Sequence, residues 1–248
     1  MKTQTYNLTN KDVTLTTYIL DSSFDHKKNY KRPAVLVFPG GGYGMCSNRE
    51  AEPIAMHFLA MGYNAFVLRY SLNENSMFPR PLQDADEAMQ MIIDNCDEWL
   101  VDAEKIAVCG FSAGGHLAAA LGTMGKIRPA AMILGYPCIT KDICNDVDVL
   151  KNHENVPVLD DKVDGNTPPA FIFASSDDGL VPVRSSIKFA EALSEKGIPH
   201  QMHIFSEGGH GFSTADYVTC EGHFEFSCAQ WISLCREWLY NLFIKPID

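Results

Sequence analysis

Residues 105–116 read KIAVCGFSAGGH. They combine a predicted buried strand, Lys105–Gly110, with a G-x-S-x-G turn and the start of a short predicted helix, His116–Met124. The turn from strand to helix is so tight that only small residues fit on either side of Ser112, and both neighbours in the pattern are glycines. The N-terminus of the following helix favours negative charge beside the hydroxyl group. The pattern therefore predicts that Ser112 is a nucleophile, and a purely structural glycine turn is the alternative.

Short apolar segments with strand character alternate with helix-like segments along the rest of the chain. Strands are expected at Val13–Leu20, Ala34–Phe38, Asn64–Arg69, Ala130–Gly135, Ala170–Ala174 and Gln201–Phe205, and helices at Ala51–Gly62, Pro81–Asp94, Arg184–Lys196 and Cys228–Phe243. This alternation predicts an α/β fold with a mostly parallel central sheet and helices on both faces. The carboxyl ends of such strands meet at one edge, where open α/β sheets hold their functional sites.

The chain length of 248 residues fits one α/β domain, and neither an internal repeat nor a linker divides it. A single domain over residues 1–248 is expected. The segment Pro137–Pro169 is polar and weakly periodic, so it is expected to form a loop excursion or at most a small cap.

Composition excludes several classes of partner. The net charge is −11 and no basic stretch occurs, which disfavours binding to nucleic acid or to anionic membranes. No apolar run is long enough to span a bilayer. The eight cysteines are scattered without a C-x-x-C pair, so reduced thiols and a cytoplasmic location are expected, unless a signal peptide has been removed. No metal or cofactor is expected.

A serine nucleophile needs a base that is itself held by an acid. Both residue types occur just after predicted strands. Asp177 and Asp178 follow the strand Ala170–Ala174, and His210 follows the strand Gln201–Phe205 between glycines. Asp178 is the preferred acid because an Asp three residues before Val-Pro matches the usual spacing in this fold, while Asp177 remains the alternative.

A glycine loop follows the strand Ala34–Phe38 and reads PGGGY at 39–43. Glycines allow backbone N–H groups to approach a reacting carbonyl closely. The N–H groups of Gly41, Gly42 and Ala113 are predicted to form an oxyanion hole. A phosphate-binding loop is the alternative, but the loop lacks the G-K-[ST] ending. The candidates for the wall of the substrate pocket are Tyr43, Tyr70 and His223.

These motifs together resemble the α/β-hydrolase superfamily, and more narrowly its small esterase/lipase branch, which includes hormone-sensitive-lipase-like and acetyl-xylan-esterase-like enzymes. The resemblance runs from about Pro33 to the C-terminal helix. It rests on PGGGY (39–43), QDA (83–85), GFSAGG (110–115), TPPAFIFASSDDGLVPV (167–183) and GGHGF (208–212). Pro39 departs from the family, because many relatives have a histidine there, at the start of an HGGG-type motif.

The resemblance implies a serine hydrolase of small, short-acyl esters, possibly a deacetylase of acetylated carbohydrates. Its triad would be Ser112, His210 and Asp178, and the reaction would pass through an acyl-enzyme without a cofactor. Two alternatives stay open: a peptidase or amidase of the prolyl-oligopeptidase type, and a non-catalytic binding protein on the same fold. The oligomeric state is not indicated by the sequence.

Overall fold

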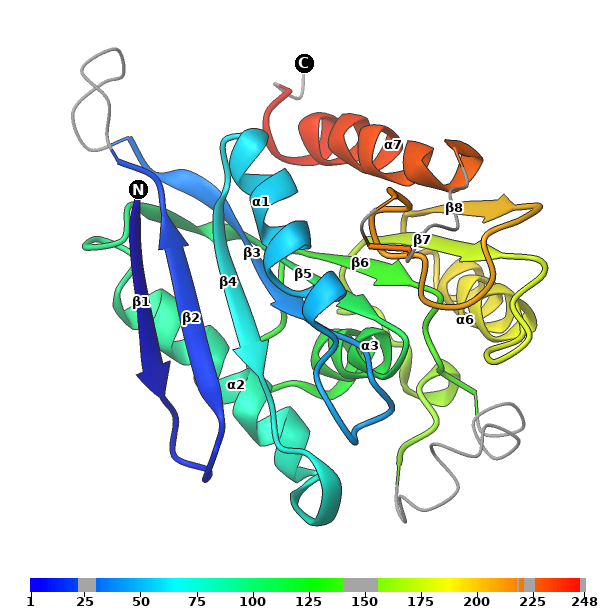
Figure 1. Ribbon diagram of the computed structural model, residues 1–248, viewed down its shortest axis with the longest axis horizontal. Coiled ribbons are helices and arrows are strands. Elements are labelled where there is room, and N and C mark those ends of the chain that lie inside the picture. Colours follow the sequence, from blue (N-terminus) through cyan, green and yellow to red (C-terminus); the bar gives the residue numbers. More distant parts are fainter. Residues whose placement is uncertain (22–29, 141–155, 218, 221–225, 246–248) are drawn as a thin grey trace.

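The computed structural model describes residues 1–21, 30–140, 156–217, 219–220 and 226–245. Its centre is an eight-stranded sheet with the strand order β1-β2-β4-β3-β5-β6-β7-β8 (Figure 1). The strands are β1 (Lys2–Asn7), β2 (Thr14–Ile19), β3 (Arg32–Phe38), β4 (Asn64–Arg69), β5 (Val101–Phe111), β6 (Ala131–Gly135), β7 (Ala170–Ser175) and β8 (His200–Phe205). β1 and β2 run antiparallel to their neighbours, and β3 through β8 are parallel to one another. The predicted mostly parallel sheet is confirmed.

Helices cover both faces of this sheet, as the alternation of segments predicts. They are α1 (Glu52–Ala60), α2 (Arg80–Asp94), α3 (Ala113–Met124), α6 (Arg184–Glu195) and α7 (Phe226–Phe243), with short 3₁₀ turns η1 (Asn48–Glu50), η2 (Asn73–Asn75) and η3 (Asp160–Lys162). α1 and α7 lie on one face, and α2, α3 and α6 lie on the other (Figure 1). Two apolar cores result. Phe58 and Trp231 belong to the first, and Met89, Leu117 and Phe189 belong to the second.

The structure differs from the sequence prediction mainly at the ends of elements. β1 is not predicted, because its residues are polar and lie exposed on the sheet edge, so they show no apolar alternation. β5 begins at Val101, several residues before the predicted start. α3 begins at Ala113 rather than at His116, so the helix starts directly after Ser112.

The structure describes the predicted excursion over residues 137–169 only at its two ends. There the N–H of Leu159 donates to the carbonyl of Ile139, which holds the ends together. Arg128 forms an ion pair with Asp164. Whether the excursion is a small cap, and whether residues 1–248 form one domain, stay predictions.

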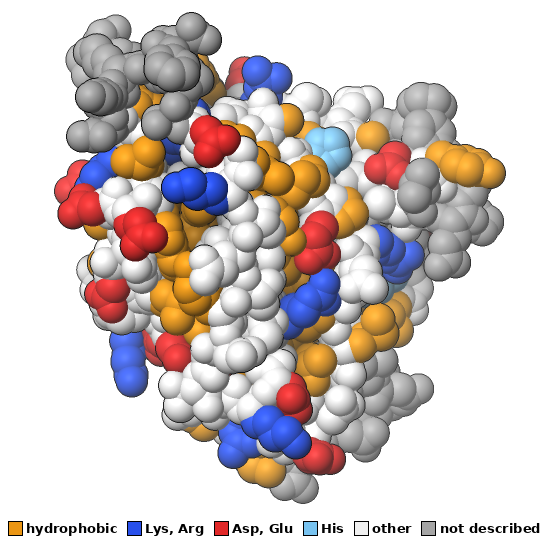
Figure 2. Space-filling view, turned by 60° about the vertical axis from the view of Figure 1, so that its left-hand side comes forward, with side chains coloured by type: hydrophobic (Ala, Val, Ile, Leu, Met, Phe, Trp, Pro, Cys, Tyr) orange, Lys and Arg blue, Asp and Glu red, His pale blue; other side chains and the backbone are white. Residues whose placement is uncertain are grey.

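Charge is mixed over the surface. On the face drawn in Figure 2, the acidic and basic side chains of the described residues are interspersed. Within the described ranges, no helix combines the length and apolarity that a bilayer span requires. The cytoplasmic location stays a prediction.

The expectation that the cysteines are reduced is met only in part. Among the described residues, six cysteines are free: Cys46, Cys96, Cys109, Cys220, Cys228 and Cys235. Cys138 is disulfide-bonded, so the expectation is wrong for this residue.

The buried residue His116 links the loop after β3 to the segment before β7, through Tyr43 and Pro157. His116 on α3 has no exposed surface. Its Nε2 lies 3.0 Å from the carbonyl oxygen of Pro157, and its Nδ1 lies 2.8 Å from the hydroxyl of Tyr43. A carbonyl only accepts, so Nε2 carries the proton and Nδ1 accepts from the tyrosine. Burial lowers the pKa of His116 from 6.5 to about 4, so the ring is neutral at physiological pH.

This shift predicts acid sensitivity. The unfolded chain binds the proton at its ordinary pKa of 6.5 and the folded chain binds it only near 4. The contribution of His116 to stability is therefore complete above pH 6.5 and is lost as the pH falls toward 4. We expect urea unfolding at pH 4.5 and 7.5 to show a loss of about 2–3 kcal/mol from this group. His116→Gln should remove that part of the pH dependence, and an unchanged pH dependence in the variant would contradict the assignment.

Candidate active site

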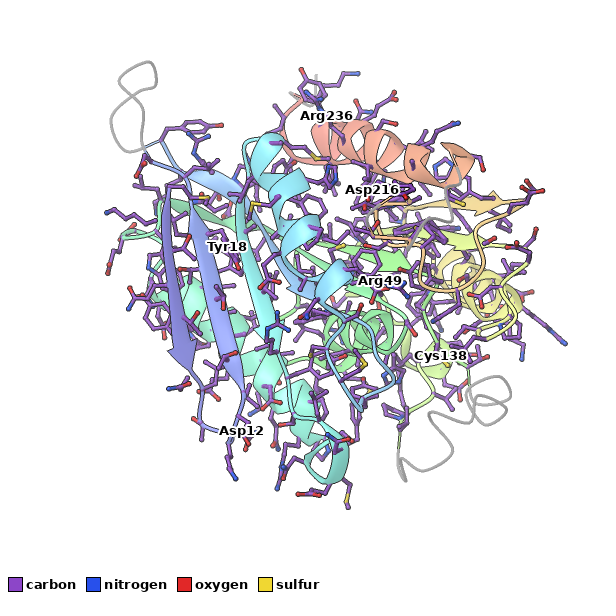
Figure 3. The ribbon with its side chains drawn as sticks, in the orientation of Figure 1. Asp12, Tyr18, Arg49, Cys138, Asp216 and Arg236 are labelled. Atoms are coloured by element: carbon purple, nitrogen blue, oxygen red, sulfur yellow. The ribbon has the colours of Figure 1, made fainter. Side chains whose placement is uncertain are left out.

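A cavity of about 550 Å³ opens at the carboxyl edge of the sheet. It is lined by residues from the loop after β3, from the turn after β5, and from the loops after β6, β7 and β8. Figure 3 shows Arg49 and Cys138, which line it from two of these segments. Its lining residues are Gly41, Gly42, Met45, Ser47, Asn48, Arg49, Glu50, Ser112, Ala113, Cys138, Leu180, Val181, His210 and Gly211.

Ser112 occupies a strained turn at the end of β5. Its φ is +52° and its ψ is −117°, a conformation that L residues rarely adopt. The two flanking glycines explain why the turn is possible. A Cβ on Gly110 would clash with the backbone of Gly114, and a Cβ on Gly114 would clash with the carbonyl of Phe38. The backbone of this turn can approach its neighbours so closely only because both positions lack a side chain. Ser112 then lines the cavity.

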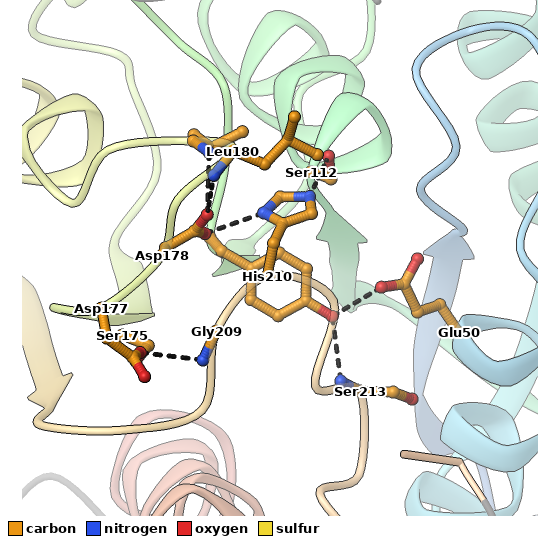
Figure 4. A network of polar contacts seen from close by, with 11 residues as sticks. Glu50, Ser112, Ser175, Asp177, Asp178, Leu180, Gly209, His210 and Ser213 are labelled. Atoms are coloured by element: carbon orange, nitrogen blue, oxygen red, sulfur yellow. Dashed lines mark hydrogen bonds and ion pairs between the residues drawn. The ribbon is translucent and has the colours of Figure 1, made fainter. Parts of the chain in front are cut away.

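The structure brings together the three residues of the predicted triad (Figure 4). His210 Nε2 lies 2.9 Å from Ser112 Oγ, and His210 Nδ1 lies 2.7 Å from Asp178 Oδ2. The N–H groups of Leu180 and Val181 donate to Asp178 Oδ1 at 2.9 and 2.8 Å. A carboxylate that accepts these bonds fixes the proton of the imidazole on Nδ1, so Nε2 is free to accept a proton from the serine hydroxyl.

Asp177, the alternative acid, holds the histidine loop instead. It accepts hydrogen bonds from the hydroxyl of Ser175 and from the N–H of Gly209, the latter at 2.8 Å (Figure 4). These bonds, led by the one from Ser175, lower the pKa of Asp177. The two neighbouring aspartates therefore have different contacts. Asp178 faces the imidazole of His210, and Asp177 holds the backbone of the loop that carries this histidine.

The predicted oxyanion donors also face the cavity. Gly41, Gly42 and Ala113 all line it. In the ranges that the structure describes, their N–H groups donate no hydrogen bond. Gly41 and Gly42 have φ of +125° and +61°, which glycine adopts readily. Three backbone N–H groups that make no other hydrogen bond among the described residues thus lie beside the turn at Ser112. The N-terminus of α3 follows this turn directly.

Sequence reasoning missed a buried network that joins these parts. Glu50 is buried. Its carboxylate accepts hydrogen bonds from the N–H of Gly40 at 2.8 Å and from the hydroxyl of Tyr136 at 2.6 Å. Ser213 N–H in turn donates to the tyrosine hydroxyl at 3.0 Å (Figure 4). Since the tyrosine oxygen already accepts from Ser213, its own proton points to Glu50, and the carboxylate accepts on both oxygens. The ring of Tyr136 also packs edge-on against His210, with 5.1 Å between centroids.

Burial raises the pKa of Glu50, while the hydrogen bonds from Tyr136 and Gly40 oppose that rise. The network ties the glycine loop after β3 to the loop that carries His210. No sequence pattern signals it, because Tyr136 lies 86 residues from Glu50.

The predicted pocket residues are placed differently. Tyr43 and Tyr70 are almost completely buried and do not line the cavity, so that prediction is wrong for both. Tyr43 has a φ of +60°, and its hydroxyl contacts His116 in the core. Tyr70 donates to the carbonyl of Pro39 at 2.6 Å and so supports the glycine loop from below. His223 lies outside the described residues.

No group of three or more potential metal ligands occurs in the part of the chain that the structure describes. The sheet order, the strained serine turn after β5 and the acid and histidine loops after β7 and β8 define the α/β-hydrolase fold.

Comparisons with known proteins agree with this class. The BD-FAE family model matches residues 20–132, and the prolyl oligopeptidase family model matches residues 77–228. MGS-M1, an α/β hydrolase enzyme from a Medee basin deep-sea metagenome library, is 42% identical, with a TM-score of 0.89 and 98% of each chain covered. An acetyl ester-xyloside bifunctional hydrolase from Caldicellulosiruptor lactoaceticus is 32% identical, with a TM-score of 0.82, 96% of this chain and 91% of that chain covered.

Among curated proteins, an acetylxylan esterase from Xylanibacter ruminicola is 31% identical over 72% of this chain. The chain spans 41% of the length of that protein and 34% of the length of another curated relative. The chain belongs to the α/β-hydrolase superfamily, as the resemblance in its motifs implies.

The buried network predicts a loss of stability in Tyr136→Phe. The substitution leaves Glu50 Oε1 and the Ser213 N–H each without a hydrogen-bond partner in the protein interior, while Glu50 Oε2 keeps its bond from Gly40. We expect urea denaturation to show a loss of about 2–4 kcal/mol.

Tyr63→Phe is the matched control. Tyr63 is also buried, but its hydroxyl makes no hydrogen bond in the described part of the chain, so the cost should stay below about 1 kcal/mol. Equal losses in the two variants would show that the network contributes nothing specific.

Proposed function

We propose that the protein is a serine carboxylic ester hydrolase that acts on short-acyl esters, in particular acetyl esters of carbohydrates. The observation that carries this proposal is the position of His210, which lies within hydrogen-bond distance of both Ser112 and Asp178. Beside them lie the three uncommitted N–H groups of the cavity.

In the proposed mechanism, Ser112 Oγ attacks the ester carbonyl while His210 Nε2 takes its proton. The carbonyl oxygen becomes an oxyanion and accepts hydrogen bonds from the N–H groups of Gly41, Gly42 and Ala113. The imidazolium, stabilised by Asp178, then donates its proton to the leaving alcohol oxygen, and an acyl-serine remains. Water attacks this intermediate with His210 again as base, which releases the acid and restores the serine.

Two observations support short acyl groups on a larger alcohol. Relatives of this chain carry the names acetylxylan esterase and acetyl ester-xyloside hydrolase. The exposed side chains of Met45 and Leu180 line the cavity, whose mouth is open to solvent among the described residues. An open mouth suits an ester group that projects from a sugar chain.

Amide hydrolysis is the second candidate, because the prolyl oligopeptidase family model matches residues 77–228. The same three side chains would serve an amide bond. A non-catalytic binding protein is the third candidate and predicts no turnover at all.

Ser112→Ala tests the proposal. We expect the wild type to hydrolyse 4-nitrophenyl acetate faster than the butyrate and the octanoate, and to release acetate from acetylated xylan. Loss of the nucleophile should lower kcat by roughly a thousandfold or more, since no other group forms the acyl intermediate.

Thermal unfolding should show that Ser112→Ala is folded. Unchanged ester turnover in this variant would disprove the mechanism. Turnover of a matching 4-nitroanilide without turnover of the ester would favour the amidase. Absence of turnover on both substrates would favour the binding protein.

Glu50→Gln tests the electrostatic part of the mechanism. Glu50 and His210 interact electrostatically, so the carboxylate favours the imidazolium that forms during the reaction. Removing this charge should lower kcat about tenfold and move the acidic limb of the pH–rate profile to lower pH.

The matched control is Glu52→Gln, which removes a charge two residues away on an exposed side chain that pairs with Arg69. We expect an unchanged profile for this control. A profile that moves equally in both variants, or in neither, would rule out a specific role of Glu50.

A further inference from the structure

Arg49 is the only lysine or arginine among the described residues that line the cavity. It lies on η1, between the glycine loop and α1, and is labelled in Figure 3. The catalytic proposal gives this side chain no part.

The guanidinium lies over the backbone next to His210. A Cβ placed on Gly211 would be 2.5 Å from Arg49 Nη2, so the arginine packs directly on this glycine. The backbone of Arg49 is fixed as well, because Ser213 Oγ donates to its carbonyl oxygen at 2.5 Å. The guanidinium therefore lies on the cavity wall, beside the proposed base.

Most hydrogen-bond donors of this guanidinium are unused. In the ranges that the structure describes, it makes one hydrogen bond, from Nη1 to the carbonyl of Thr219 at 3.5 Å. A guanidinium has five N–H donors. No ion pair of Arg49 occurs within the same ranges.

The carboxylates of the site are engaged elsewhere. Glu50 accepts from Gly40 and Tyr136, and Asp178 accepts from two backbone N–H groups and faces His210. The side chain of Asp178 has no exposed surface. The donors of Arg49 are therefore available to a ligand in the cavity and not to the acids around it.

We propose that Arg49 binds a carboxylate group on the ester substrate. This inference rests on the proposed esterase function and names its substrate class: an ester with a carboxylate on its alcohol part, as in a uronate-bearing acetylated sugar, or on its acyl part, as in a dicarboxylate half-ester. A guanidinium matches a carboxylate with two parallel hydrogen bonds. Because the protein has a net charge of −11, an anionic substrate gains nothing from the overall field and needs such a local cation.

Two matched substrate pairs test this. The first is 4-acetoxybenzoate and its methyl ester, which place the carboxylate on the alcohol side. The second is 4-nitrophenyl hemisuccinate and 4-nitrophenyl methyl succinate, which place it on the acyl side. The readout is the ratio of kcat/KM for the anionic member to kcat/KM for the neutral member. We expect Arg49→Met to lower this ratio roughly ten- to hundredfold in one of the pairs, and that pair identifies the side.

Arg236→Met is the matched control. Arg236 is an exposed arginine on α7, away from Arg49 (Figure 3), and its loss changes the net charge by the same amount. Its ratios should equal those of the wild type. Arg49→Lys should give an intermediate ratio, because the charge remains and the paired geometry is lost.

Equal ratios in the wild type and in Arg49→Met, for both pairs, would overturn the inference. If Ser112→Ala still abolished turnover of the neutral esters, the esterase proposal would stand without it. If the wild type hydrolysed no member of either pair, the esterase proposal itself would fail.

Discussion

The close approach of the chain to itself around Ser112 is the constraint on which the rest of the site depends. β5 can turn directly into α3 only because Gly110 and Gly114 leave room for the neighbouring backbone. The turn forces Ser112 into a positive φ, and this strain is offset by the surrounding packed strands. It also points the start of α3 at the cavity. The turn between β5 and α3 thus places both the hydroxyl of Ser112 and the N-terminus of α3 at the cavity.

The remaining groups reach that place from far along the chain, so they need their own supports. His210 is carried by a loop with several glycines, which has little stiffness by itself. Asp177 fixes the first half of this loop through Gly209, and Tyr136 fixes the second half through Ser213. Because Tyr136 also binds Glu50, the support of the histidine loop and the support of the glycine loop are the same buried network.

Much of this arrangement is predictable because it follows from strand ends. The strands of a parallel sheet end at one edge, so a serine, an acid and a histidine after β5, β7 and β8 must lie near each other. Contacts without a local signal are not predictable in this way. Glu50 looks like a surface residue in the sequence, and its partner Tyr136 belongs to another loop. The position of Tyr43 directly after the glycines predicts that it lines the cavity, but its backbone has a positive φ and its ring lies in the core. β1 cannot be predicted from apolar alternation, because this edge strand is exposed and has no apolar face.

The segment between β3 and α1 shows how one short turn serves both stability and recognition. Glu50 faces inward and is buried, where its carboxylate holds two loops. Arg49, its neighbour in the same 3₁₀ turn, lines the cavity with most of its donors unused. Adjacent residues of a tight helical turn point in different directions. A change at position 49 therefore alters the charge of the cavity, while the hydrogen bonds of Glu50 to Gly40 and Tyr136 involve other side chains and backbone. Substrate preference can therefore vary at this turn while the hydrogen bonds that join the glycine loop to the histidine loop are kept.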